Sequence, residues 1–74
     1  MADAPPVHVT INGIAHTLPA AATVRDAVAA LGLDPAVPGV AAAVGDEIVP
    51  RRLWAERPLR GGDRVEVVTA AQGG

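Results

Sequence analysis

The stretch VHVTINGIAHTL, residues 7–18, predicts a β-hairpin with a two-residue turn. Apolar and polar residues alternate over residues 7–11, which is typical of a strand with one buried face. Asn12-Gly13 follows, and this dipeptide suits a type I′ turn because both central residues of that turn need a positive φ. The turn places Ile11 opposite Ile14, so the register of the hairpin is predicted as well.

A helix is predicted after the hairpin. Thr23 can cap its first turn, and Asp26, three residues later, completes a capping box. Gly32 suits the left-handed position that ends a helix, and Pro35 prevents the helix from resuming. Apolar residues recur with the helical period and give the helix one buried face, formed by Val24, Ala27, Val28 and Leu31.

Three further strands are predicted beyond the helix. Short apolar or alternating runs occupy residues 40–44, 48–49 and 64–69, and the first of these runs is expected to be a buried strand. The segment 51–57 is expected to be irregular or to form a single helical turn. Its Trp54 is the only aromatic residue of the chain and is expected to fill the core.

The order of these elements predicts the fold. A hairpin, a crossing helix, a strand, a short returning strand and a last strand beside the first make the β-grasp arrangement. The fold class is therefore α+β: a ubiquitin-like β-grasp whose mixed sheet of four to five strands is covered on one face by one main helix. We expect a disordered leader at residues 1–6, a β-grasp domain at 7–69 and a flexible tail at 70–74.

Composition limits what so small a domain can do. Half of the 74 residues are apolar, but sixteen are Ala and eleven are Val, so a deep ligand cavity is hard to build and no enzyme activity is expected. The net charge of −2 without any basic run argues against nucleic-acid binding. No apolar stretch approaches the roughly 20 residues that span a bilayer, and the cytoplasm is the default compartment. Because cysteine is absent, thiolate catalysis is excluded, and we expect no metal or cofactor.

The terminal Gly73-Gly74 is the feature that indicates chemistry. Fraying alone would explain a glycine-containing tail. The functional explanation is steric, because only glycine lets the backbone enter a partner's narrow channel without a Cβ. There the carboxylate of Gly74 could be adenylated, and sulfide or a persulfide could then attack the carbonyl. The product would be a C-terminal thiocarboxylate, whose sulfur is a good nucleophile at neutral pH.

A set of motifs spans nearly the whole chain: Ile11-Asn12-Gly13, Leu18-Pro19, Thr23-Val24, GDEIVPR at 45–51, WAE at 54–56, Leu59, GDRVEVVTA at 62–70 and Gly73-Gly74. In combination these motifs closely resemble the ThiS family, the sulfur carriers of thiamine thiazole biosynthesis. The resemblance implies a β-grasp fold and a thiocarboxylate on Gly74, with Gly73 as its required neighbour. It also implies three partners: a ubiquitin-activating-type adenylating enzyme (ThiF-like), a sulfur donor protein and a thiazole synthase (ThiG-like).

Two segments depart from the usual pattern of that family. Gly45-Asp46 stands where the family usually has Asn-Gly, which suggests a different turn type. The tail keeps the last two glycines but not a third. Neither departure touches Gly74, the residue that would react.

The last predicted strand carries the candidate docking residues. Alternation directs Arg64, Glu66 and Val68 away from the helix, next to the tail that contains Gln72. A partner that takes up the tail is expected to bind these four residues.

The two histidines could be imagined as a metal pair. The predicted register directs His8 outward and His16 inward, so they cannot share a metal, and no metal site is predicted.

Other functions are compatible with the same residues. The chain could serve molybdopterin or another pathway as a sulfur carrier. It could also be a β-grasp module for protein interaction, or a modifier that is conjugated to proteins through Gly73-Gly74. The mass of the C-terminus in the native cell would distinguish these functions.

Overall fold

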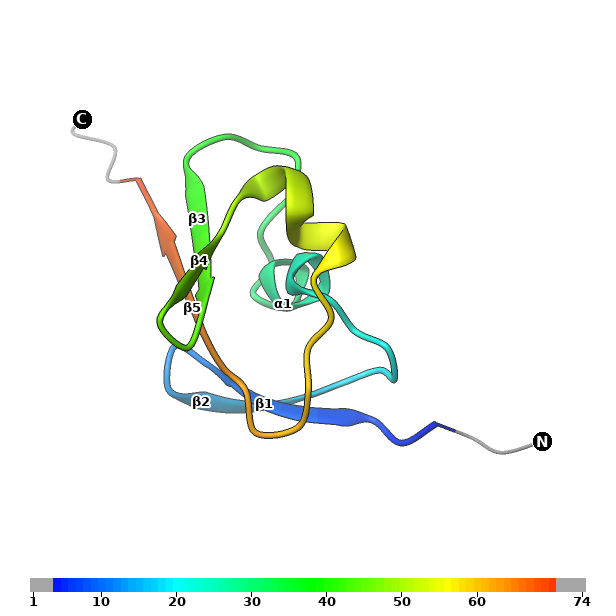
Figure 1. Cartoon of the computed structure of the whole chain (residues 1–74). Helices are drawn as coiled ribbons and strands as arrows, with labels where there is room; N and C mark the ends of the chain where they lie inside the picture. Colours follow the sequence, from blue (N-terminus) through cyan, green and yellow to red (C-terminus); the bar gives the residue numbers. More distant parts are fainter. Residues whose placement is uncertain (1–3, 71–74) are drawn as a thin grey trace.

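The computed structural model describes residues 4–70, in which a helix packs across a five-stranded sheet (Figure 1). The order of strands in the sheet is β2-β1-β5-β3-β4. The elements are, in chain order, β1 (Val7–Ile11), β2 (Ile14–Leu18), α1 (Val24–Ala30), β3 (Val40–Val44), β4 (Glu47–Val49), the 3-10 helix η1 (Arg51–Glu56) and β5 (Arg64–Thr69).

The hairpin prediction is confirmed in both its turn and its register. Asn12 and Gly13 have φ angles of 53° and 82°, the positive values that a type I′ turn requires. Ile11 pairs with Ile14, and the antiparallel ladder continues to the far ends of β1 and β2. Because β2 is the first strand of the sheet order, no other strand within residues 4–70 pairs with its outer edge.

Helix α1 begins and ends at the residues that the sequence indicates. The backbone N–H of Thr23 donates a hydrogen bond of 2.7 Å to the carboxylate of Asp26, as in a capping box. Gly32 has a φ of 80° and donates its N–H to the carbonyl of Ala29 at 2.9 Å, which closes the last turn. No helix within residues 4–70 is long and apolar enough to cross a membrane.

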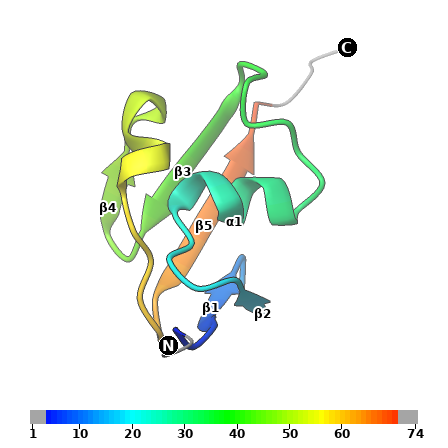
Figure 2. The same cartoon turned by 90° about the vertical axis from the view of Figure 1, so that its right-hand side faces the viewer.

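Strand β5 lies in the middle of the sheet and joins its two halves (Figure 2). It runs parallel to β1, where Ile11 pairs with Val65, and antiparallel to β3 along its length. The side chain of Asn12 extends the pairing beyond the end of β1. Its Nδ2 donates to the carbonyl of Val67 at 3.0 Å, and its Oδ1 accepts the N–H of Val67 at 2.8 Å. This arrangement of strands around a crossing helix is the β-grasp fold of the α+β class, as predicted.

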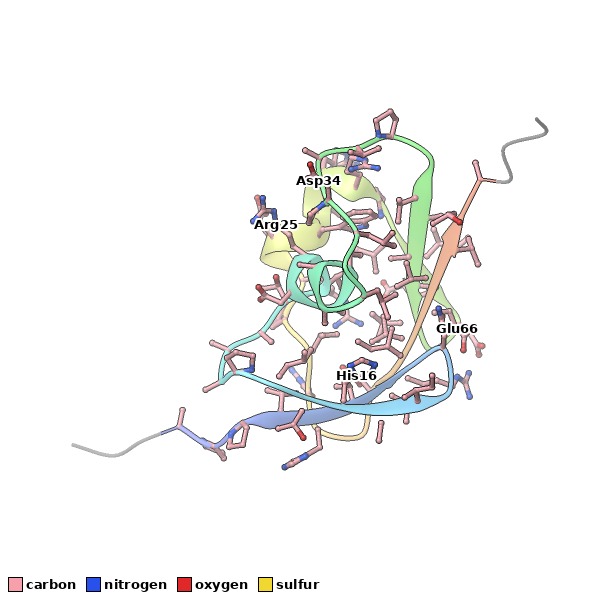
Figure 3. All side chains as sticks on the ribbon, turned by 180° about the vertical axis from the view of Figure 1, so that it is seen from behind. His16, Arg25, Asp34 and Glu66 are labelled. Atoms are coloured by element: carbon pink, nitrogen blue, oxygen red, sulfur yellow. The ribbon has the colours of Figure 1, made fainter. Side chains whose placement is uncertain are left out.

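The core fills the space between α1 and one face of the sheet (Figure 3). Every buried residue among residues 4–70 is apolar, and the most deeply buried large side chains are Ile11, Val24, Val28 and Val65. Trp54 is only 2% exposed, and its indole N–H donates to the carbonyl of Val49 at 2.9 Å. The prediction that Trp54 fills the core is therefore confirmed.

Two segments differ from what the sequence predicts. Strand β3 is not buried throughout: Ala42 and Val44 face the core, whereas Ala41 is exposed. The reason is that α1 covers only one face of the sheet, so every second residue of β3 lies on the other face. The segment after β4 is also more regular than expected, because η1 is a 3-10 helix of six residues.

Candidate functional site

The tail leaves the domain from the central strand. Strand β5 ends at Thr69, and the N–H of the next residue, Ala70, donates a hydrogen bond of 2.6 Å to the carbonyl of Gly39. Ala70 is the last described residue. The predicted reactive pair Gly73-Gly74 and the predicted partner-binding Gln72 lie outside the described residues.

The uncovered face of the sheet adjoins the root of the tail. Of the predicted docking residues, Arg64, Glu66 and Val68 all lie on this face, and Val68 is 61% exposed. Their outward orientation is confirmed. Figure 3 shows Glu66 on the outer side of the sheet, away from α1.

The structure adds three apolar residues to this face that the docking prediction did not include. Ala41 of β3 pairs with Val68, and Ala43 lies between Glu66 of β5 and Ile48 of β4. Ile48 is 76% exposed, a high value for a large apolar side chain. We call the six residues together the open face: Ala41, Ala43, Ile48, Arg64, Glu66 and Val68. The sequence of β3 is apolar throughout, so only the order of the strands in the assembled sheet identifies these added residues.

Charged side chains lie at the margin of this apolar surface. Nη2 of Arg64 lies 3.8 Å from Oδ1 of Asp46, and both side chains are largely exposed. Such an exposed pair contributes little to stability, so both charges are available to a partner. A hollow of about 150 Å³ lies among the small side chains of β3 and between Ile48 and Val68. The open face therefore offers an apolar, slightly concave centre with acidic and basic groups beside it.

The two histidines lie on opposite faces of the hairpin, as predicted. His16 pairs with Val9, whose side chain is buried, and Figure 3 shows His16 on the side of the sheet that faces α1. His8 is exposed, and its Nδ1 lies 3.2 Å from Oγ1 of Thr17. Across residues 4–70, no group of three or more His, Cys, Asp or Glu side chains is placed to hold a metal ion.

Comparison with known proteins identifies the family. The family model of ThiS matches residues 9–74, most of the chain, including Gly73 and Gly74. The chain belongs to the ThiS family. A solved structure described as thiamine biosynthesis protein (ThiS) from Geobacter metallireducens has the same fold, with a TM-score of 0.70 and 24% sequence identity. The match covers 92% of this chain and 100% of that one. No curated protein matches the sequence.

The match to the ThiS family covers both parts of the candidate site, the open face and the tail. The family model extends through the end of β5 and the tail, so the match includes both the open-face residues of β5 and the two glycines. The sequence resemblance noted above is therefore confirmed at the level of the family and of the β-grasp fold.

Proposed function

We propose that this chain is a sulfur carrier of thiamine biosynthesis whose C-terminal Gly74 is converted to a thiocarboxylate. The observation that carries the proposal is the ThiS family match over residues 9–74, which includes Gly73-Gly74. The fold supports it, because the tail follows directly from the central strand of a β-grasp sheet.

The chemistry begins with activation of a poor acyl donor. The carboxylate of Gly74 attacks the α-phosphate of ATP, pyrophosphate leaves, and the carbonyl now carries AMP as a good leaving group. Sulfide, or the terminal sulfur of a persulfide, attacks this carbonyl and AMP departs. With sulfide the thiocarboxylate forms directly, whereas with a persulfide a thiol must then cleave the S–S bond. The resulting sulfur is anionic and nucleophilic, as thiolates are, and attacks the substrate of a thiazole synthase.

The domain acts in this scheme as a rigid handle for the tail. At the tail end of β5, Thr69 pairs with Val40 of β3 and the N–H of Ala70 is bonded to the carbonyl of Gly39, so the domain holds the root of the tail beside β3. Four residues follow Ala70, and an extended chain of that length reaches about 14 Å. That reach would carry the carboxylate of Gly74 into a partner's active site while the domain stays outside.

Catalysis in this proposal belongs to partners, not to the chain itself. An adenylating enzyme of the ThiF type supplies the ATP chemistry, a donor protein supplies the sulfur, and a synthase of the ThiG type receives it. Because the tail is short, a partner that takes it up must lie against the domain close to β5. The open face fits this requirement, since Val68 lies near the tail end of β5. Glu66 and Arg64 continue the same face toward the start of the strand, and Ile48 widens the apolar area. We assign Gln72, within the tail, to the same contact.

Deletion of Gly74 tests the proposal. ATP–pyrophosphate exchange with the adenylating enzyme encoded in the same organism should be lost, because the new terminus stops one residue short of the α-phosphate. Replacing Gly73 by leucine should have the same effect, since a Cβ and its branches would block the narrow channel. The urea midpoint of both variants should equal that of the parent chain. Normal exchange by the Gly74-deleted chain would refute the proposal.

Intact-mass measurement on the protein from its native cell tests the alternatives. A fraction whose C-terminus has sulfur in place of one oxygen supports the carrier. A covalent adduct with another protein would indicate a modifier, and an invariably unmodified acid would indicate an interaction module. Transfer of the sulfur to thiazole synthase, compared with transfer to molybdopterin synthase, would then identify the pathway.

A further inference from the structure

Arg51 joins two parts of the chain that are separate in sequence. Its guanidinium donates hydrogen bonds to the carbonyls of Pro35 and Val37, which lie in the loop between α1 and β3. The same group lies over the ring of Trp54, 4.6 Å from the ring centroid. Trp54 is buried and its indole N–H is bonded to Val49 of β4, so the ring that Arg51 packs against is held in place by the core.

The loop that Arg51 holds has its own local order. The carboxylate of Asp34 accepts the N–H of Ala36 at 2.9 Å, and the carbonyl of Asp34 accepts the N–H of Val37 at 3.0 Å. Pro35 and Pro38 restrict φ within this turn. The loop is therefore ordered by its own contacts, and the two hydrogen bonds from Arg51 attach it to η1.

The far end of this loop holds the root of the tail. Gly39 has a φ of 92°, and its carbonyl accepts the N–H of Ala70. A Cβ at Gly39 would lie 3.6 Å from the Cβ of Ala70, an ordinary van der Waals distance, so the two residues lie side by side. Figure 2 shows the loop passing from the end of α1 to the start of β3, beside the end of β5.

Two hollows border this contact. One, of about 420 Å³, is lined by Arg51, Val68 and the contact itself, and the other, of about 310 Å³, lies on the side of Leu33 and Asp34. Both include Gly39 and Ala70 in their walls. The contact between Gly39 and Ala70 therefore borders open space at the surface of the domain.

We propose that Arg51 is a positioning residue: it holds the loop of residues 35–39 against Ala70 and so sets the direction in which the tail leaves the domain. This inference rests on the proposed function, because the direction of the tail matters only if a partner takes up the tail. Arg51 acts through the loop that ends at Gly39.

The physical effect is on the cost of ordering the tail when it binds. Without the bonds from Arg51, the loop and the backbone of Ala70 sample more conformations, and binding must then fix them. Fixing the backbone of one residue lowers the affinity by roughly 5- to 30-fold. The chemical step is unchanged once the tail is in place, so the loss should fall on KM and not on kcat.

Arg51→Ala, with Arg52→Ala as its control, tests this role. Arg52 is the next residue of η1 and is exposed, and its side chain forms no hydrogen bond or ion pair with any residue between 4 and 70. In the isolated carrier, Arg51→Ala should speed amide hydrogen exchange at Ala70 by about tenfold, whereas Arg52→Ala should leave it unchanged. The urea midpoint should fall by less than about 1 M in both variants.

ATP–pyrophosphate exchange with the adenylating enzyme provides the second readout. Arg51→Ala should raise the KM for the carrier by roughly 5- to 30-fold with little change in kcat. Arg51→Lys should give an intermediate value, because the compact ammonium keeps the charge but lacks the two separate nitrogens with which the planar guanidinium reaches both carbonyls. Unchanged exchange at Ala70 in Arg51→Ala would overturn the proposal, and so would an unchanged KM. If the parent chain supports no ATP–pyrophosphate exchange, the proposed function fails, and the Ala70 measurement still decides whether Arg51 orders the root of the tail.

Discussion

Replacing Asn12 by aspartate separates two roles of one residue. As the first residue of the type I′ turn, Asn12 can be replaced by Asp with little effect, because Asp-Gly also suits this turn. Asn12 also extends the β1–β5 pairing, and in this second role aspartate cannot replace it. The side-chain amide both donates to and accepts from the backbone of Val67. A carboxylate keeps the acceptor and loses the donor.

The expected cost follows from the geometry of that contact. The Val67 carbonyl lies 3.0 Å from Nδ2 of Asn12, and after the substitution it would face a carboxylate oxygen instead. Leaving a buried acceptor without a donor costs about 1–3 kcal/mol. The contact is only partly buried, so water can reach it and we expect about 1–2 kcal/mol.

Urea denaturation measures this loss of stability. With an m-value of about 1 kcal/mol/M, the low end of the range for small domains, the midpoint should fall by about 1–2 M. Asn12→Gly is the comparison, since Gly-Gly also permits the turn but removes both side-chain bonds. The Val67 amide should stay protected from hydrogen exchange in Asn12→Asp and lose protection in Asn12→Gly. A midpoint for Asn12→Asp equal to that of the parent chain would show that Asn12 serves only the turn.

The remaining predictions concern the core and the open face. Trp54→Ala should lower the free energy of unfolding by about 3–5 kcal/mol, because Trp54 is 2% exposed and its N–H is bonded to Val49. A urea midpoint near that of the parent chain, with partner binding lost instead, would contradict the role of Trp54 in the core. Val68→Asp should weaken binding to the adenylating enzyme by about 2 kcal/mol or more, which raises the Kd by a factor of roughly 30. The urea midpoint should stay unchanged, because Val68 is already exposed. Unchanged affinity in the folded variant would mean that the partner binds another face.

Much of the fold could be predicted because its signals are local. The positive φ angles of Asn12 and Gly13, the capping box of Thr23 and Asp26 and the left-handed Gly32 each depend on a few consecutive residues. The position of β5 beside β1 then followed from the order of the elements. The misjudged burial of β3 has a similar explanation: its sequence is apolar throughout, and only the position of the helix shows that one face is left uncovered.

The candidate site was predictable in part. Alternation was sufficient to place Arg64, Glu66 and Val68 on the outer face of β5. It was not sufficient to bring Ile48 of β4 into the same surface, because that depends on β3 lying between the two strands. The cross-strand neighbours of a residue are set by strand order, which alternation within one strand does not contain.

The elements, the turn chemistry, the composition of the core and the ThiS motifs are all encoded locally, because each of them depends on neighbouring residues or on a repeated pattern. Which distant groups meet depends instead on the assembled fold. Asn12 reaches Val67 across 55 residues of sequence, and Arg51 reaches the loop whose Gly39 holds Ala70. These contacts join polar side chains to backbone groups that every residue possesses, so they leave no periodic trace in the sequence and arise only once the sheet is assembled.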